Sequence, residues 1–144
     1  MRLTVYTDYS LRMLMYLAVK GDSRSTIAEV AGAYGVSKAH LTKVAHQLGV
    51  AGYVSTVRGK GGGLVLARPA AEIRLGDVVR RTEPDLALVP CLEPGQGCCP
   101  IVPACGLRGA LNEARAAFLA VLDRYSLADL VQRWAELADL LHVA

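Results

Sequence analysis

The sequence predicts a mainly α-helical chain with one small β hairpin, organised as a winged helix-turn-helix followed by a long helix. Two amphipathic segments meet at Tyr34-Gly35-Val36, where glycine relieves the strain of a tight corner between helices. Two segments rich in β-branched residues flank the glycine-rich run 58–63, which is typical of a hairpin. Apolar residues recur every three or four positions over 107–125, as along a coiled-coil-like helix.

Three helices are expected before the hairpin. Thr7 is expected to cap the first, because its hydroxyl can accept from an unpaired N–H of the opening turn, and Gly21 ends it. The second covers 26–33, and the third opens at Ser37 and ends at 49–52. The inner faces follow helical spacing, and in chain order they are Leu11, Leu14, Met15 and Ala18, then Ile27, Val30 and Ala31, then Leu41, Val44, Ala45 and Leu48.

The hairpin is predicted from strands at 53–57 and 64–66, with a flexible and basic tip between them. The tip holds a Gly-Lys pair, but the G-x-x-x-x-G-K-[ST] spacing of a phosphate-binding loop is absent and strands flank both sides. Nucleotide binding is therefore not expected. A short helix over 75–83 follows.

The remaining chain is expected to form a proline-rich loop with all four cysteines, a helix roughly 27 Å long at 1.5 Å per residue, and one final helix. Ser126 and Asp129 resemble a capping box for that last helix, which carries apolar side chains as far as Leu141. The apolar stripe of the long helix is Leu107, Leu111, Ala114, Phe118, Val121 and Tyr125.

Charge is unevenly distributed along the chain. Residues 1–68 hold nine Lys and Arg against three acids, whereas residues 69–144 hold seven against ten. A basic front half favours a polyanionic partner, and an ordinary solvated surface is the alternative.

The outer face of the predicted third helix supplies candidate contacts to double-stranded DNA. Short or basic donors near a helix N-terminus reach phosphates and base edges in a major groove, and those on this face are Ser37, Lys38, His40, Thr42 and Lys43. In the wing, Arg58 suits a minor groove and Lys60 a phosphate. An amphipathic helix with a merely solvated side is the alternative. An enzyme is the weakest interpretation, because the sequence has no G-x-S-x-G, no H-E-x-x-H and no recognisable catalytic carboxylate pair.

The cysteines follow the pattern Cys91-x6-Cys98-Cys99-x5-Cys105, which lacks the C-x2-C of the commonest zinc sites. Cys98 and Cys99 are adjacent and cannot easily direct both thiols at one metal, so three converging thiolates and one spare cysteine are expected. Soft ligands on a bent loop suit an iron–sulfur cluster, and a structural zinc site or free buried thiols are the alternatives.

The expected location is the cytoplasm. The N-terminus shows no secretory signal, and no apolar stretch reaches the length of a membrane span. Cysteines in that reducing compartment are expected to bind metal or sense redox state rather than form structural disulfides.

Several motifs together resemble a known family. They are Thr7-Asp8-Tyr9-Ser10-Leu11-Arg12, Gly52-Tyr53-Val54 with Val57-Arg58-Gly59-Lys60-Gly61-Gly62, Cys99-Pro100-Ile101-Val102-Pro103-Ala104-Cys105, and the tail from Ala117-Phe118-Leu119 to Asp123-Arg124-Tyr125-Ser126-Leu127-Ala128-Asp129-Leu130. With them the chain resembles the winged-helix iron–sulfur transcriptional regulators, the family of NsrR, IscR and RirA. The resemblance covers nearly the whole chain and is greatest to the nitric-oxide sensors of the family.

The resemblance implies a homodimer held by the long helix, with the cluster loop beside that interface. It implies cluster ligation by Cys91, Cys99 and Cys105 and by Asp8 donated from the partner subunit, while Cys98 departs from the family pattern. The His that some members carry just after the last cysteine is absent here, and others have an amide in place of the acid. An acid in the first turn is also explained by the helix dipole alone. The cluster is expected to be [4Fe-4S], with [2Fe-2S] as the alternative.

The resulting boundaries are a winged helix-turn-helix DNA-binding domain with its short connecting helix at 1–83, the cluster loop at 84–106, and the dimerisation helix with the C-terminal helix at 107–144. The functional hypothesis is a repressor whose cluster senses nitric oxide and whose damage releases it from DNA. A regulator that responds to iron or cluster status and a zinc-stabilised DNA-binding module are the alternatives.

Overall fold

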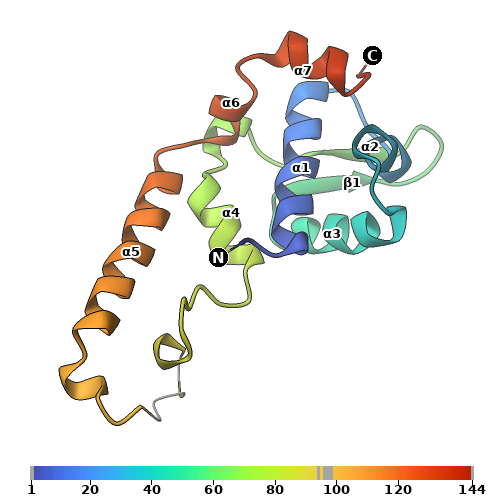
Figure 1. Cartoon of the computed structure of the whole chain (residues 1–144). Coiled ribbons are helices and arrows are strands. Elements are labelled where there is room, and N and C mark those ends of the chain that lie inside the picture. The colour runs from blue at the N-terminus through green and yellow to red at the C-terminus, as the bar shows by residue number, and fades with distance from the viewer. Residues whose placement is uncertain (1, 94, 96–98, 144) are drawn as a thin grey trace.

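The computed structural model describes residues 2–93, 95 and 99–143. Its helices are α1 (Val5–Lys20), α2 (Ile27–Tyr34), α3 (Lys38–Val50), α4 (Leu75–Thr82), α5 (Gly106–Asp123), α6 (Leu127–Leu130) and α7 (Trp134–Leu140), and its strands are β1 (Val54–Val57) and β2 (Gly63–Leu66). The predicted fold class, mainly helical with one antiparallel hairpin, is confirmed. In Figure 1, α1 lies centrally between α4 and the pair α2 and α3, while α5 extends away from the core. No helix of the described residues is long and apolar enough to cross a bilayer.

The central helix α1 begins earlier than predicted. Its cap is Thr4, whose hydroxyl accepts from the Thr7 N–H at 3.2 Å. Thr7 is instead fully buried, and its hydroxyl donates to Thr82 Oγ1 on α4 at 2.8 Å. The assignment of the cap to Thr7 was therefore wrong, because a contact with a distant helix takes up that hydroxyl.

The inner face of α1 also differs from the prediction. Only Leu14 of the four expected residues is fully buried, and its buried apolar neighbours are Met13, Tyr16 and Leu17. The reason is that α1 packs against α3, α4, β2 and both C-terminal helices, so that more than one side of it is covered.

The helix-turn-helix follows the prediction closely. Thr26 and Glu29 form a reciprocal capping box at the start of α2. Gly35 ends α2 in the left-handed conformation, with φ of 62°, which glycine adopts without strain. The predicted inner face of α3 is buried at all four positions: Leu41, Val44, Ala45 and Leu48.

The hairpin pairs β1 with β2 in the antiparallel register that matches Val54 with Leu66. A third segment joins it, which the sequence did not predict. The Ser25 N–H donates to the Leu64 carbonyl at 3.0 Å, and the Leu64 N–H donates back to Ser25 at 2.7 Å. The connection between α1 and α2 thereby extends the hairpin edge.

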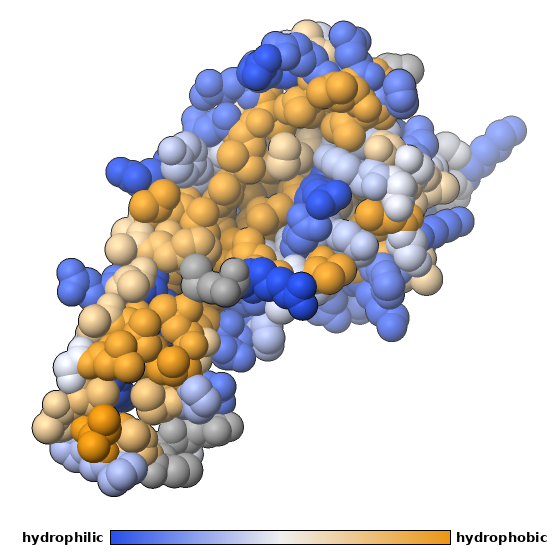
Figure 2. All heavy atoms as spheres, viewed as in Figure 1, coloured by the Kyte–Doolittle hydropathy of each residue, from blue (hydrophilic) through white to orange (hydrophobic). Residues whose placement is uncertain are grey.

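A bidentate ion pair attaches the C-terminal end of α5 to α4. Arg80 Nη1 and Nη2 donate to the two carboxylate oxygens of Asp123 at 2.6 and 2.7 Å. A Cβ at Gly76 would lie 1.8 Å from Asp123 Oδ1, so glycine allows this close approach. Figure 2 shows apolar residues gathered along α5, and no α5 residue is buried.

The cysteine-bearing loop and the C-terminus each contain more structure than expected. Short 3-10 helices occupy Pro90–Leu92 and Val102–Ala104 within the predicted loop. The capping box of Ser126 and Asp129 is confirmed, but the expected single helix after it is wrong. Two helices form instead, with a break at 131–133, because Leu127 is anchored in the core and α7 turns to lie against α1.

Candidate functional site

The outer face of α3 is a solvent-facing surface. All five predicted contact residues on it are exposed: Ser37, Lys38, His40, Thr42 and Lys43. The Thr42 hydroxyl donates to the Lys38 carbonyl at 2.9 Å, which leaves its oxygen free to accept. The His40 ring lies 6.3 Å from the Tyr9 ring of α1, measured between centroids. These five polar side chains are therefore accessible to solvent on the part of α3 that its buried apolar face leaves uncovered.

The wing carries the two other predicted DNA contacts, and both Arg58 and Lys60 are exposed on its tip. In Figure 1 the loop between β1 and β2 projects away from the helical core. The tip has internal structure, because the Gly62 N–H donates to the Gly59 carbonyl at 2.9 Å. A Cβ at Gly62 would lie 2.3 Å from the Val57 carbonyl oxygen. The tip therefore forms a turn in which position 62 requires glycine.

Asp8, the predicted fourth ligand, lies in the first turn of α1 and pairs with Arg12. Arg12 Nε lies 3.0 Å from Asp8 Oδ1, and both side chains are 44% exposed. The same guanidinium lies over the Tyr34 ring, with Cζ 5.7 Å from its centroid. Tyr34 is the last residue of α2, so this contact connects Asp8 to the turn that precedes α3.

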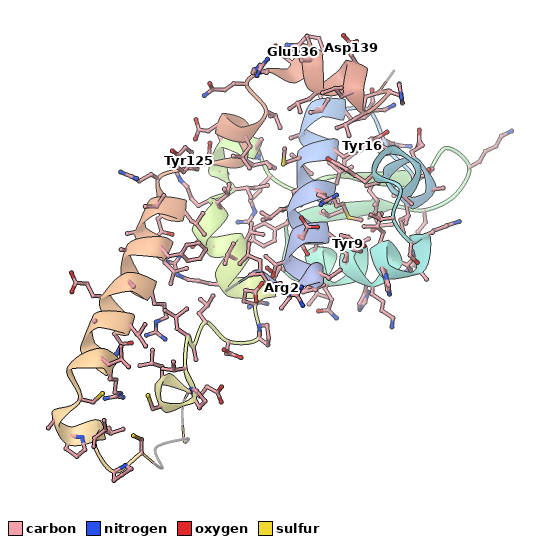
Figure 3. The ribbon with its side chains drawn as sticks, viewed as in Figure 1. Arg2, Tyr9, Tyr16, Tyr125, Glu136 and Asp139 are labelled. Atoms are coloured by element: carbon pink, nitrogen blue, oxygen red, sulfur yellow. The ribbon has the colours of Figure 1, made fainter. Side chains whose placement is uncertain are left out.

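Aromatic side chains extend the contact into the core. Tyr34 meets Tyr16 edge to face at 6.5 Å between ring centroids, and Figure 3 shows Tyr9 and Tyr16 on the side of α1 that faces α2 and α3. Burial raises the pKa of Tyr34 to about 12, and the nearby Arg12 charge opposes that rise. The Tyr34 hydroxyl therefore stays protonated, and the Arg12 contact involves a neutral ring.

The predicted thiol ligands lie around the start of α5. Cys105 is the N-cap of α5, and its Sγ accepts from the Arg108 N–H at 3.4 Å. Arg108 Nε also donates to the Cys91 carbonyl at 3.4 Å. Cys91 and Cys105 are half-buried and Cys99 is exposed. Arg108 thus bridges the segments that carry Cys91 and Cys105.

The three thiols are not gathered into a finished site. Within residues 2–93, 95 and 99–143, no three His, Cys, Asp or Glu side chains are arranged to hold a metal ion. Cys98, the spare cysteine of the prediction, lies outside the described residues. The sequence did not predict two residues that contact the predicted ligands, Arg12 and Arg108. The spacing of Asp8 and Arg12 by four residues was a readable signal, whereas the Arg108 bridge depends on the folded loop.

The chain is similar to known transcriptional regulators along almost its whole length. The profile of the family named Rrf2, described as "Iron-dependent Transcriptional regulator", matches residues 3–133. A curated relative from Bacillus subtilis (strain 168), the HTH-type transcriptional regulator NsrR, is 48% identical over 98% of this chain and 97% of its own. The protein of the same name from Geobacillus kaustophilus (strain HTA426) is 46% identical over the same shares. The solved structure of CymR, the global cysteine regulator of B. subtilis, is 27% identical with a TM-score of 0.75, over 92% of this chain and 98% of that one.

Proposed function

The chain belongs to the Rrf2 family of transcriptional regulators, and on that premise we propose that it is a repressor released from DNA when nitric oxide damages a bound iron–sulfur cluster. Membership makes it a DNA-binding regulator rather than an enzyme. The observation that carries the coupling is the position of Arg12 between Asp8 and Tyr34. It provides a physical route from a ligand position to the helix that reads DNA.

DNA reading is assigned to α3 and the wing. The exposed donors of α3 suit base edges and phosphates in a major groove, with Lys38 and Lys43 as its cations. Arg58 and Lys60 on the wing suit a minor groove and a phosphate.

The donor set fits an iron–sulfur cluster by its chemistry. Thiolates are the ligands such clusters take, and the α5 N-terminus with Arg108 places N–H donors and positive charge beside Cys91 and Cys105. We assign Cys91, Cys99 and Cys105 as ligands together with Asp8 of the partner subunit, for a cluster of [4Fe-4S] type. When bound, the cluster supplies the iron that nitric oxide attacks.

Asp8 and Arg12 perform the coupling. The carboxylate that would bind the cluster is the one that pairs with Arg12. While Asp8 is bound, its negative charge is therefore divided between the cluster and Arg12, and when Asp8 is released it interacts with Arg12 alone. Arg12 passes this change to Tyr34 and the turn before α3. Two reading helices of a dimer must match half-sites about 34–36 Å apart, so a small shift of this turn alters DNA affinity.

A homodimer is part of the proposal. The stripe on α5 leaves large apolar side chains in solvent, with Leu107 66% and Val121 43% exposed. A helix with such a stripe and no buried residue is stabilised by burying it against a second copy. Hollows of about 440 Å³ beside α5 and about 660 Å³ beside Asp8 give the partner's cluster loop a surface to occupy.

The test uses the full chain purified without oxygen and reconstituted with iron and sulfide. We expect a coloured protein that binds duplexes selected from a random pool, with affinity that falls as nitric oxide is titrated. Cys99→Ser is expected to abolish the colour, and Cys98→Ser is the matched control that keeps it. Asp8→Ala keeps the colour and alters the response of DNA affinity to nitric oxide.

Other results would overturn parts of the proposal. A colourless protein that contains zinc identifies a zinc-stabilised module. Release from DNA on iron chelation but not on addition of nitric oxide identifies an iron-status regulator, which the family description as iron-dependent favours as the second candidate.

A further inference from the structure

The wing is held from outside the hairpin by the connection between α1 and α2. We infer that Arg24 in this connection is an additional phosphate-contacting residue, fixed against the wing tip so that it meets the DNA backbone together with Arg58 and Lys60. The inference rests on DNA binding alone and is independent of the cluster.

Two consecutive residues of the connection form hydrogen bonds with the hairpin. Arg24 Nη1 donates to the Gly61 carbonyl at 2.8 Å, next to Lys60 at the tip. Ser25 exchanges two main-chain hydrogen bonds with Leu64 of β2. The side chain of one residue therefore holds the tip while the backbone of the next holds the strand, which places the Arg24 guanidinium at the wing.

Glycine makes the close approach possible. A Cβ at Gly63 would lie 2.9 Å from the Ser25 carbonyl oxygen and 3.2 Å from Arg24 Cβ. Gly61, whose carbonyl accepts the hydrogen bond from Arg24, has φ of 75°, a left-handed conformation that glycine adopts without strain. The tip glycines thus allow the connection to pack against the wing.

The charge of Arg24 remains available. A guanidinium has five N–H donors, and the Gly61 carbonyl takes one of them. Arg24 is exposed, and within the described part of the chain no carboxylate forms an ion pair with it. A planar fork with free donors suits a phosphate, and a fixed fork loses less freedom on binding than a mobile one.

The test measures binding of the full chain, purified without oxygen and reconstituted with iron and sulfide, to a mixed-sequence duplex over a range of salt concentrations. Each phosphate contact contributes about 0.9 to the slope of log affinity against log salt. Loss of one contact therefore lowers the affinity at about 0.1 M salt about eightfold relative to the affinity at about 1 M salt. We expect Arg24→Gln to lower the slope by about that amount for each protomer bound and Arg24→Lys to restore it. Arg133→Gln removes a charge near α7 and is the matched control, with no expected change.

Hydrogen exchange supplies a second measurement. Arg24→Gln is expected to speed exchange of the Leu64 N–H, which Ser25 protects, without changing the thermal midpoint by more than Arg133→Gln does. A slope equal to wild type would overturn the phosphate contact. Exchange equal to wild type at Leu64 would overturn the fixed position, and a wild-type chain that binds no duplex would overturn the inference together with the DNA-binding role on which it rests.

Discussion

The guanidinium of Arg12 lies between the Asp8 carboxylate, at 3.0 Å, and the Tyr34 ring, at 5.7 Å from Cζ to the centroid. It therefore joins the first turn of α1 to the last residue of α2. The hydrogen bond that Arg12 donates to Asp8 raises the pKa of Arg12, so the guanidinium stays charged. Any change at Asp8 acts on a contact that ends at the helix-turn-helix corner.

The first prediction concerns the stability of this contact. Arg12→Gln removes both an exposed ion pair, worth about 0.2–1 kcal/mol, and a cation–π contact, worth about 0.5–1 kcal/mol. In a chain that already carries Asp8→Asn, the ion pair is absent, so adding Arg12→Gln removes only the cation–π contact. Urea unfolding should therefore show a lower free energy of unfolding for the double variant than for Asp8→Asn alone. Equal free energies would mean that the Tyr34 contact contributes nothing.

A second prediction follows from the buried hydroxyl chain between α1 and α4. Thr7 donates to Thr82, and Thr82 donates to the Val78 carbonyl at 2.9 Å. Thr7→Val leaves the Thr82 oxygen without its donor, at an expected loss of about 1–3 kcal/mol. The double variant Thr7→Val with Thr82→Val should lose less than the sum of the single losses, because both partners of one bond are removed. Strict additivity in thermal unfolding would contradict the pairing.

The sequence predicted the fold best where structure is local. The left-handed Gly35, the buried face of α3 and the Ser126 cap each follow from a few neighbouring residues. The cap of α1 did not, since Thr4 and Thr7 are equally good cap residues and only the contact with Thr82 distinguishes them. The break before α7 likewise depends on where α1 lies.

In the candidate site, too, features set by neighbouring residues were predictable and contacts between distant segments were not. Exposure of the α3 donors was predictable from helical periodicity, whereas the Arg24 contact with Gly61 joins a loop to a hairpin tip. Arg108 lies at the start of α5 and contacts the carbonyl of Cys91, which precedes it by 17 positions in the chain. Such contacts between distant segments carry no local sequence signal.

A third prediction concerns pH and the attachment of α5. Hydrogen bonds from Arg80 lower the pKa of Asp123 below its ordinary value of 3.8. A carboxyl whose pKa is depressed by folding adds stability above its unfolded value, and this is lost as pH falls through the folded value. Arg80→Gln should return the pKa of Asp123 toward 3.8 in a carboxyl NMR titration, and the part of the acid-induced loss of stability that this carboxyl contributes should then disappear. An unchanged titration would show that the pair does not persist in solution.

The shape of the wing tip gives a fourth prediction. A Cβ at Gly62 would lie 2.3 Å from the Val57 carbonyl oxygen, which is main chain and cannot move aside alone. Gly62→Ala should therefore rearrange the tip and weaken binding to a mixed-sequence duplex. Gly32→Ala is the control, since nothing lies within 4 Å of a Cβ there. Equal DNA affinity of the two variants would contradict a defined tip.

The final prediction concerns the second copy of the chain. Val121 is 43% exposed on the apolar stripe of α5, and the neighbouring Ala120 is exposed about 100° around the helix, outside that stripe. Val121→Glu places a charge in the proposed interface, where desolvation without a partner is strongly unfavourable. Sedimentation should show a shift from dimer to monomer, with DNA affinity reduced because two half-sites can no longer be bound together. Ala120→Glu adds the same charge outside the apolar stripe and should stay dimeric. A monomeric wild type, or a Val121→Glu variant as dimeric as Ala120→Glu, would exclude this face of α5 as the interface.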